Sequence, residues 1–214
     1  RAVELHKQNK PRAEAIARAL EFVRGPIRSQ IRDALEGREV LTIDNEPAAR
    51  VYARWTERQV PWPVGPILRE TTLSPLARQV GTLDEMPYYK LSHPEAVTER
   101  EGLRLFTETR LGERLQLMYS SQEGLLQRSL NAVRIEPEYG MAGNLEPIGA
   151  LVVFCAGCRL ALGDSLSDVV GHFSQRLGEI PFITPFTFGE QGRLPHGELA
   201  HGNLMVSSVI FLES

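Results

Sequence analysis

IGALVVFC, Ile148 to Cys155, is the stretch of sequence that decides the fold class, because it is apolar on both of the faces that a β-strand presents. A strand of this kind is typical of a central position in a sheet that is covered on both sides. We therefore predict that Ile148 to Cys155 is the middle strand of the fold, with Val152 and Val153 away from any solvent-exposed edge.

After this run the sequence predicts a helix and two more strands. Ser165 and Asp168 are typical of a helix start, and Gly178 is typical of a helix end. The apolar residues that share one face of this helix are Leu166, Val169, Val170, Phe173 and Leu177. Strand-like runs follow at Pro181 to Phe188 and Asn203 to Leu212. This order favours the α/β (α+β) class, with a mixed β-sheet flanked by helices in a single compact domain.

Before the central strand, the chain opens with a predicted helix and a hairpin. Residues 11 to 24 have helical spacing, and Gly25-Pro26 ends that helix. Two strand-like segments, Ile27 to Ala34 and Arg38 to Ile43, flank a glycine-containing turn.

The next segments predict a second helix and an extended connection. Pro47 suits a first helical turn, and the helix should end before Pro61. Its apolar face is formed by Ala48, Val51, Tyr52 and Trp55. Pro61 to Pro66 reads as extended, because its prolines cannot donate backbone hydrogen bonds. A long irregular stretch is then expected.

A second hairpin and a third helix complete the pattern. Leu103 to Thr109 and Leu115 to Tyr119 are strand-like, and we expect them to pair around Leu111-Gly112. Ser121 is typical of an N-cap. The helix that it caps carries Leu126, Leu130 and Val133 on one face.

Composition excludes several classes of protein. The chain has 24 basic and 27 acidic residues, a net charge of −3, so we expect no nucleic-acid partner. Its longest apolar runs fall short of the ~20 residues that cross a bilayer, so no membrane insertion and a cytoplasmic location are expected. A start at Arg1 without a secretory signal favours a piece of a longer protein.

The two cysteines, Cys155 and Cys158, form a CxxC motif. A redox pair normally lies at a helix N-terminus, but Gly163-Asp164 separates this pair from the helix predicted above. A structural zinc needs four ligands, and no histidine stands at ligand spacing. Both chemistries stay open, and we expect ordinary buried thiols that are reduced and metal-free.

No enzyme motif is present. The sequence contains neither a GxSxG elbow nor a GxxxxGK[ST] or GxGxxG phosphate loop. His93, His196 and His201 lie in predicted loops, where solvated side chains are the expectation, and His172 lies on a helix flank. We expect no catalysis by this chain.

One group of residues predicts a ligand site. Arg159 and Glu190 follow two predicted strands, and ligands collect beyond the carboxyl ends of strands in open α/β sheets. A guanidinium binds a carboxylate and a glutamate binds an ammonium, so this pair suits an amino acid. Phe186 and Phe188 would add an apolar wall. The alternative is that Arg159 and Glu190 pair with each other or with solvent.

Seven segments of the chain are similar to the C-terminal domain of the FIST family, the F-box and intracellular signal transduction sensory domains. They are FCAGCRLALG (154–163), PFTFGEQG (185–192), HGNLMVSSVIF (201–211), VLTIDNEPAARVYARW (40–55), and the strand-like pieces between Tyr88 and Met118. The resemblance covers residues 27 to 214 as one sensory domain and leaves residues 1 to 26 as an N-terminal helical segment. The sequence differs from the family's usual pattern at four positions, Phe154, Cys158, Pro185 and Gly202.

The resemblance implies an intracellular sensory domain that binds a small molecule such as an amino acid and relays it to a signalling partner. Histidine kinases, cyclic-dinucleotide enzymes and chemotaxis proteins are the partners that it implies. It adds Cys155 and Asn203 to the predicted ligand-binding residues, which are then Cys155, Arg159, Phe186, Phe188, Glu190 and Asn203.

Two alternatives remain beside the small-molecule sensor. Some members of the family carry haem and report nitric oxide, and a scaffold without a ligand is the other alternative. We expect no cofactor. Any haem should be non-covalent, because Arg159 stands where the CxxCH motif requires histidine.

Overall fold

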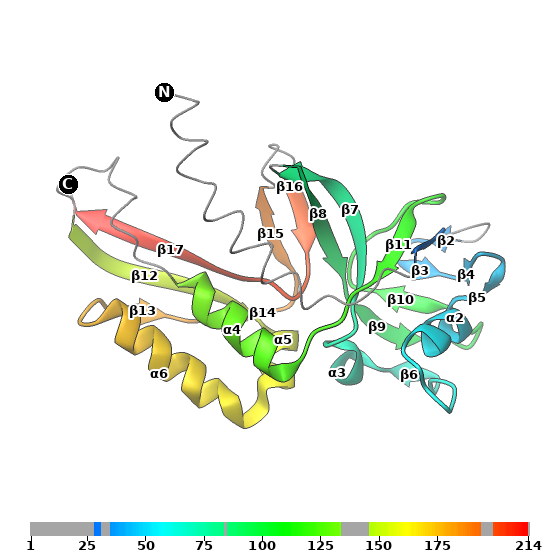
Figure 1. The fold of residues 1–214 in the computed structure, drawn as a ribbon, viewed down its shortest axis with the longest axis horizontal. Helices are drawn as coiled ribbons and strands as arrows, with labels where there is room; N and C mark the ends of the chain where they lie inside the picture. The colour runs from blue at the N-terminus through cyan, green and yellow to red at the C-terminus, as the bar shows by residue number, and fades with distance from the viewer. Residues whose placement is uncertain (1–27, 31–34, 84, 134–145, 194–198, 214) are drawn as a thin grey trace. The chain divides into compact units, whose positions relative to one another are not determined.

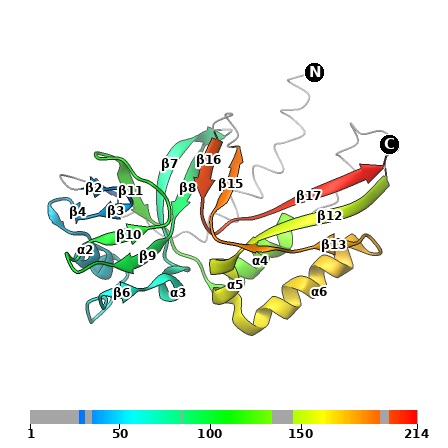
Figure 2. The same ribbon diagram turned by 180° about the vertical axis from the view of Figure 1, so that it is seen from behind.

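The computed structural model describes residues 28–30, 35–83, 85–133, 146–193 and 199–213. Within them the chain divides into two compact units. Unit 1 comprises the residues up to Ser120 together with Gln191–Asn203, and unit 2 comprises Ser121–Glu190 with Leu204–Ser214. Both units combine helices and strands (Figures 1 and 2), which confirms the α+β class. The helix predicted at residues 11 to 24 lies outside the described residues.

Unit 1 is built mainly from antiparallel strands. One sheet has the order β1-β11-β7-β8 and another the order β2-β3-β10-β9-β6, with two-stranded sheets β4-β5 and β15-β16 beside them. The strands are β1 Arg28–Gln30, β2 Leu35–Glu36, β3 Glu39–Val40, β4 Thr42–Ile43, β5 Glu46–Pro47, β6 Gly65–Pro66, β7 Leu76–Leu83, β8 Met86–Ser92, β9 Pro94–Val97, β10 Leu103–Leu105, β11 Arg114–Leu117, β15 Glu190–Arg193 and β16 Leu199–Gly202. The helices are α2 Ala48–Trp55 and α3 Leu68–Thr71.

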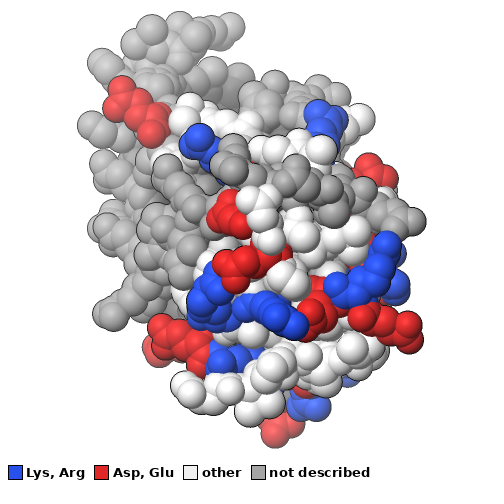
Figure 3. All heavy atoms as spheres, turned by 90° about the vertical axis from the view of Figure 1, so that its right-hand side faces the viewer, with Lys and Arg blue, Asp and Glu red and all other residues white. Residues whose placement is uncertain are grey.

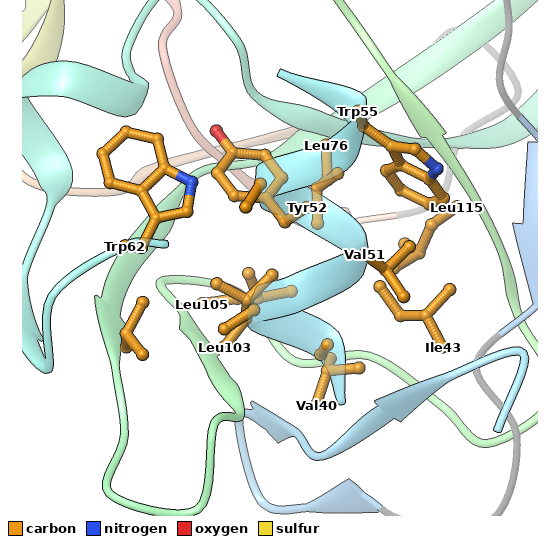
Figure 4. Close-up of a cluster of buried hydrophobic side chains, with 14 of the residues drawn as sticks. Val40, Ile43, Val51, Tyr52, Trp55, Trp62, Leu76, Leu103, Leu105 and Leu115 are labelled. Carbon is orange, nitrogen blue, oxygen red and sulfur yellow. The ribbon is translucent and has the colours of Figure 1, made fainter. Parts of the chain in front are cut away.

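Helix α2 supplies the core of unit 1, as its periodicity predicts. Val51 and Trp55 are buried, and Tyr52 is fully buried while its hydroxyl donates a hydrogen bond to the Ser74 carbonyl at 2.7 Å. Its ring stacks on Trp62, with 5.8 Å between the ring centroids, and Figure 4 shows the two rings side by side. Trp62 therefore anchors the extended Pro61–Pro66 connection to the core.

Two strand predictions for unit 1 are wrong. Residues expected to be irregular form the long β7–β8 hairpin. Strands β10 and β11 do not pair with each other, because β10 pairs with β3 and β9 whereas β11 pairs with β1 and β7. The first hairpin is confirmed around Gly37, whose φ is +60°, where β2 pairs with β3, but β1, the described part of the predicted strand Ile27 to Ala34, pairs with β11.

The surface of unit 1 carries both charge signs side by side. Figure 3 shows basic and acidic side chains alternating over the face that it views. Arg54 binds Glu46 through two bonds of 2.9 Å, and Arg50 binds Glu101 at 2.9 Å. These pairs are exposed, so each contributes little to stability, but they leave this face without a large field of one sign.

Unit 2 is a four-stranded sheet with helices on one side. Strand β12 (Glu146–Cys155) pairs in parallel with β13 (Phe182–Ile183) and β14 (Phe186–Thr187), and antiparallel with β17 (Val206–Glu213). The helical segments are α4 Gln122–Ala132, α5 Ala156–Leu162, the short 3₁₀ turn Gly163–Ser165 and α6 Leu166–Leu177. The prediction that Ile148 to Cys155 is the middle strand is confirmed.

Only one face of β12 is fully buried, so the prediction of cover on both sides is wrong. Ala150, Val152 and Phe154 are buried on the helical side, where Ser208 of β17 donates to the Ala132 carbonyl of α4 at 2.7 Å. On the other face Leu151 is half-buried, and its neighbour across the ladder, Val209, is half exposed. Figure 1 shows α4, α5 and α6 gathered on one side of the sheet.

Two helices of unit 2, α4 and α6, follow their capping signals in the sequence. Ser121 caps α4, and its side chain accepts a hydrogen bond from the Gly124 N–H at 2.9 Å. Helix α6 ends before Gly178, whose φ of +61° suits glycine. Phe173 on α6 is fully buried and meets Phe182 of β13 edge to face, at 6.4 Å between centroids.

The one-sided cover of the sheet predicts unequal costs for two phenylalanines of unit 2. Phe173→Ala should lower the free energy of unfolding by about 3 to 5 kcal/mol, because it leaves a cavity beneath α6. Phe211→Ala, at a side chain that is 50% exposed on β17, should cost about 1 kcal/mol or less. Urea unfolding of both variants measures the difference, and equal losses would contradict the described packing.

Candidate functional site

The candidate site lies at the carboxyl end of β12. Cys155 is the last residue of this strand and lies beside Thr187 of β14 in the parallel ladder. Its backbone N–H donates to the Met205 carbonyl at 3.1 Å, just before β17. Because parallel strands end at the same edge, the residues that follow β12 and β14 meet here.

Helix α5 starts immediately after β12, and sequence analysis missed it. Cys155 is its N-cap and Cys158 lies in its first turn. The prediction that the CxxC motif is separated from a helix is therefore wrong, because the motif itself begins α5. A seven-residue segment that begins Ala-Gly carries a weak helical signal, which is why α5 was missed.

The two thiols are buried next to each other and are free. Cys155 is 4% exposed and Cys158 is fully buried. A hydrogen bond from Cys158 lowers the pKa of Cys155 to about 6, assisted by the backbone N–H groups of Gly157, Cys158 and Leu204. The same hydrogen bond and burial raise the pKa of Cys158 far above its usual range. The pair therefore holds one thiolate and one thiol near neutral pH.

Glu190 is a buried carboxyl in the same cluster. It is 6% exposed, and its Oε1 accepts a hydrogen bond from the Thr187 hydroxyl at 2.9 Å. Its Oε2 is buried, and no described residue forms a hydrogen bond with it. Burial raises the pKa of Glu190 to about 7, and the negative charge of Cys155 adds to this effect. Glu190 therefore keeps its proton to a higher pH than an exposed glutamate does.

Arg159 and the two phenylalanines lie on the exposed side of unit 2. The Arg159 guanidinium lies over the Phe186 ring, 5.1 Å from its centroid, as a cation–π pair. Phe186 is 43% exposed and also meets Phe154 edge to face. Phe188 is 67% exposed. The described contacts of unit 2 thus join two pairs of the six predicted ligand-binding residues, Arg159 with Phe186 and Cys155 with Glu190.

Asn203, the sixth, belongs to unit 1 and is engaged there. Its Oδ1 accepts a hydrogen bond from the His93 N–H at 3.1 Å, and its Nδ2 donates to the Gly202 carbonyl at 2.9 Å. It is 3% exposed. These bonds give Asn203 a structural role at the junction between β8 and β9.

The expectation of a solvated side chain is wrong for His93. The ring is almost fully buried, and its Nε2 donates to the Leu68 carbonyl at 2.8 Å. Burial lowers the pKa of His93 to about 4, so the ring is neutral at pH 7. His201 is half-buried in β16, and His196 lies outside the described residues.

Neither a metal-ligand cluster nor a membrane-spanning helix occurs within the described residues. They contain no group of three or more His, Cys, Asp or Glu side chains placed to hold a metal ion. No helix among them has the length and apolar character that crossing a bilayer requires.

Comparison with known proteins assigns the family. The family model for the FIST C domain matches residues 48–193, more than half of the chain, and the protein belongs to this family. Of the six predicted ligand-binding residues, only Asn203 lies beyond the match. No curated protein and no solved structure matches the chain. The FIST C domain belongs to sensory and signal-transduction proteins, and this places the chain in that class.

The shared environment of the two thiols predicts that only one ionises near neutrality. Thiolate absorbance in the ultraviolet should rise with a midpoint near pH 6, from Cys155. Cys155→Ser should abolish this step, whereas Cys158→Ala should move it to higher pH because the side-chain hydrogen bond to Cys155 is lost. A single step near the ordinary thiol range, unchanged by either variant, would show that the thiols do not interact.

Burial of Glu190 predicts a pH-dependent stability. An acid with a raised folded-state pKa keeps its proton while the unfolded chain loses it, so the free energy of unfolding falls as pH rises. For Glu190 this window runs from 4.5 to about 7.

Glu190→Gln should remove this pH-dependent fall in the free energy of unfolding, because glutamine does not ionise. Between pH 5 and pH 8 the wild type should lose on the order of 2 kcal/mol relative to the variant, or about 4 to 8 °C in Tm. Cys155 titrates in both proteins, so its own contribution largely cancels in the comparison. Parallel Tm curves across this range would refute the raised pKa of Glu190.

Proposed function

We propose that this FIST C domain is a sensory input module that binds a small molecule, such as an amino acid, at the end of β12. The observations that carry the proposal are an exposed cation over an aromatic ring and, four residues beyond that ring along the chain, a buried carboxyl with an unpartnered oxygen. These groups are Arg159, Phe186 and Glu190.

Each group has a distinct task in this proposal. The guanidinium of Arg159 offers a planar two-point contact to a carboxylate, and its position over Phe186 orients it. Phe186 and Phe188 provide apolar surface for a side chain. The Glu190 Oε2 accepts a hydrogen bond from the ligand ammonium and thereby gains the partner that it lacks.

Binding at Glu190 supplies a signal as well as affinity. Because Oε2 is buried, the ammonium reaches it only when the segment from Thr187 to Glu190 opens locally. A ligand that binds the opened conformation better than the closed one shifts the population toward it. The change would pass to a signalling partner, for which a histidine kinase, a cyclic-dinucleotide enzyme or a chemotaxis protein are the candidates.

The proposal includes no catalysis, no cofactor and no nucleic-acid partner. It assigns binding roles alone to the side chains of the cluster, at an intracellular location. Haem is the less favoured alternative, because the buried His93 already uses its Nε2 for the Leu68 carbonyl.

A thermal-shift screen of free amino acids tests the site. An amino acid at about 100 times its Kd should stabilise the wild type by ~2.7 kcal/mol. Glu190→Gln should weaken binding roughly 10- to 150-fold, the equivalent of ~1.5 to 3 kcal/mol for a charge-assisted hydrogen bond. Arg159→Lys should also weaken it, because an ammonium lacks the planar contact. Affinity should rise with pH through about 7 as Glu190 ionises.

Glu179→Gln is the matched control, since it removes an exposed carboxylate from the same unit. It should leave the shift unchanged. If no amino acid stabilises the wild type, the ligand class is wrong. If one does so and Glu190→Gln shows the same shift, the assignment of the site is wrong.

A further inference from the structure

The ligand proposal leaves the second thiol, Cys158, without a task. It is fully buried, yet it does not pack as an isolated apolar side chain, because it forms a hydrogen bond with Cys155. Two buried, adjacent thiols beside a carboxyl with an unpartnered oxygen form a cluster whose parts match those of a dithiol redox centre.

The backbone geometry suits a disulfide. Cys155 caps α5 and Cys158 lies in its first turn. Residues one helical turn apart have Cα atoms about 5 to 6 Å apart, within the range that a disulfide spans. The bond could therefore close with little movement of β12 or α5.

We propose that Cys155, Cys158 and Glu190 form a redox-sensing site in which a hydroperoxide converts the two thiols to an intramolecular disulfide. Cys155 is the attacking sulfur, Cys158 is the resolving sulfur, and Glu190 holds the transferred proton. The site shares Glu190 with the proposed amino-acid site, but its chemistry involves neither Arg159 nor the exposed phenylalanines, so it can be tested without an amino acid.

The reaction balances in two steps. The Cys155 thiolate attacks the terminal oxygen of the hydroperoxide and the O–O bond breaks, so that Cys155 becomes a sulfenic acid. The departing alkoxide, or hydroxide from hydrogen peroxide, takes a proton from solvent and leaves as an alcohol or water. The Cys158 sulfur then attacks the Cys155 sulfur, and the S–O bond breaks. Glu190 takes the proton from Cys158 and returns it to the departing hydroxide, which leaves as water. The hydroperoxide is reduced by two electrons, and the dithiol is oxidised by two.

The burial of the site favours a small oxidant. Cys155 is 4% exposed, so a hydroperoxide of low mass has access that a protein disulfide does not. The carboxyl is suited to its step because its pKa of about 7 lets it both accept and release a proton near neutrality. The thiolate of Cys155 is the reactive form, and its hydrogen bonds favour that form.

The test uses hydrogen peroxide on the reduced protein without any ligand, followed by alkylation and mass spectrometry under non-reducing conditions. The wild type should lose both thiols together as a monomer, lighter by two hydrogen atoms, and dithiothreitol should restore them. The chain has only these two cysteines, so Cys155→Ser/Cys158→Ser is a complete blank.

The single variants distinguish the two sulfurs. Cys158→Ser should stop at the sulfenic acid, which a dimedone probe traps. Cys155→Ser should react with hydrogen peroxide at no more than about one tenth of the wild-type rate, because the remaining thiol of Cys158 is mostly protonated. Glu190→Gln should accumulate sulfenic acid before the disulfide closes.

Three results would overturn the proposal. The first is a folded wild type that keeps both thiols and forms a disulfide only in urea. The second is a disulfide between two chains in place of the intramolecular one. The third is equal reactivity of the two single variants. Closure at the wild-type rate in Glu190→Gln would overturn the role of the carboxyl. None of these results depends on whether an amino acid binds.

Discussion

The pairing of β12 with strands on both of its sides is the constraint on which unit 2 depends. The parallel ladder to β14 sets Cys155 beside Thr187, and the antiparallel ladder to β17 brings Met205 to the Cys155 backbone. Together these ladders bury the end of the strand, so the thiol of Cys155 and the carboxyl of Glu190 share one enclosed space. Their perturbed pKa values follow from that enclosure, because charge is costly there unless a hydrogen bond offsets the cost.

The residues at and after the carboxyl ends of β12 and β14 form two groups, one exposed to solvent and one buried. Arg159 and Phe186 are accessible, and they suit recognition of a small anionic group. Cys155, Cys158 and Glu190 are enclosed, and they suit the exchange of protons and electrons. The short segment Phe186 to Glu190 connects the two groups, because the Phe186 ring contacts Arg159 and the Thr187 hydroxyl donates a hydrogen bond to Glu190.

Local signals predicted the elements that depend on local chemistry. The face of α2, the Ser121 cap of α4, the glycine after α6 and the apolar run of β12 are all confirmed. The signals failed where pairing is non-local: β10 and β11 are neighbours in sequence but join different sheets. The β7–β8 hairpin was missed because Arg78, Gln79 and Lys90 interrupt the alternation of apolar and polar residues along its strands. At the site, sequence placed Arg159 and Glu190 after neighbouring strands, but the burial of Glu190 and the start of α5 depend on tertiary packing.

The central claim is that Cys155 and Glu190 share one buried environment, and the titration of the Glu190 carboxyl tests it most directly. Carbon-13 NMR of glutamate-labelled protein, with Glu190→Gln used to assign the signal, gives its pKa in the wild type and in Cys155→Ala. The account predicts a midpoint near pH 7 in the wild type and a lower one in the variant, since burial raises this pKa first and the Cys155 charge second. A Glu190 midpoint near pH 4.5 that is the same in the wild type and in Cys155→Ala would contradict the account.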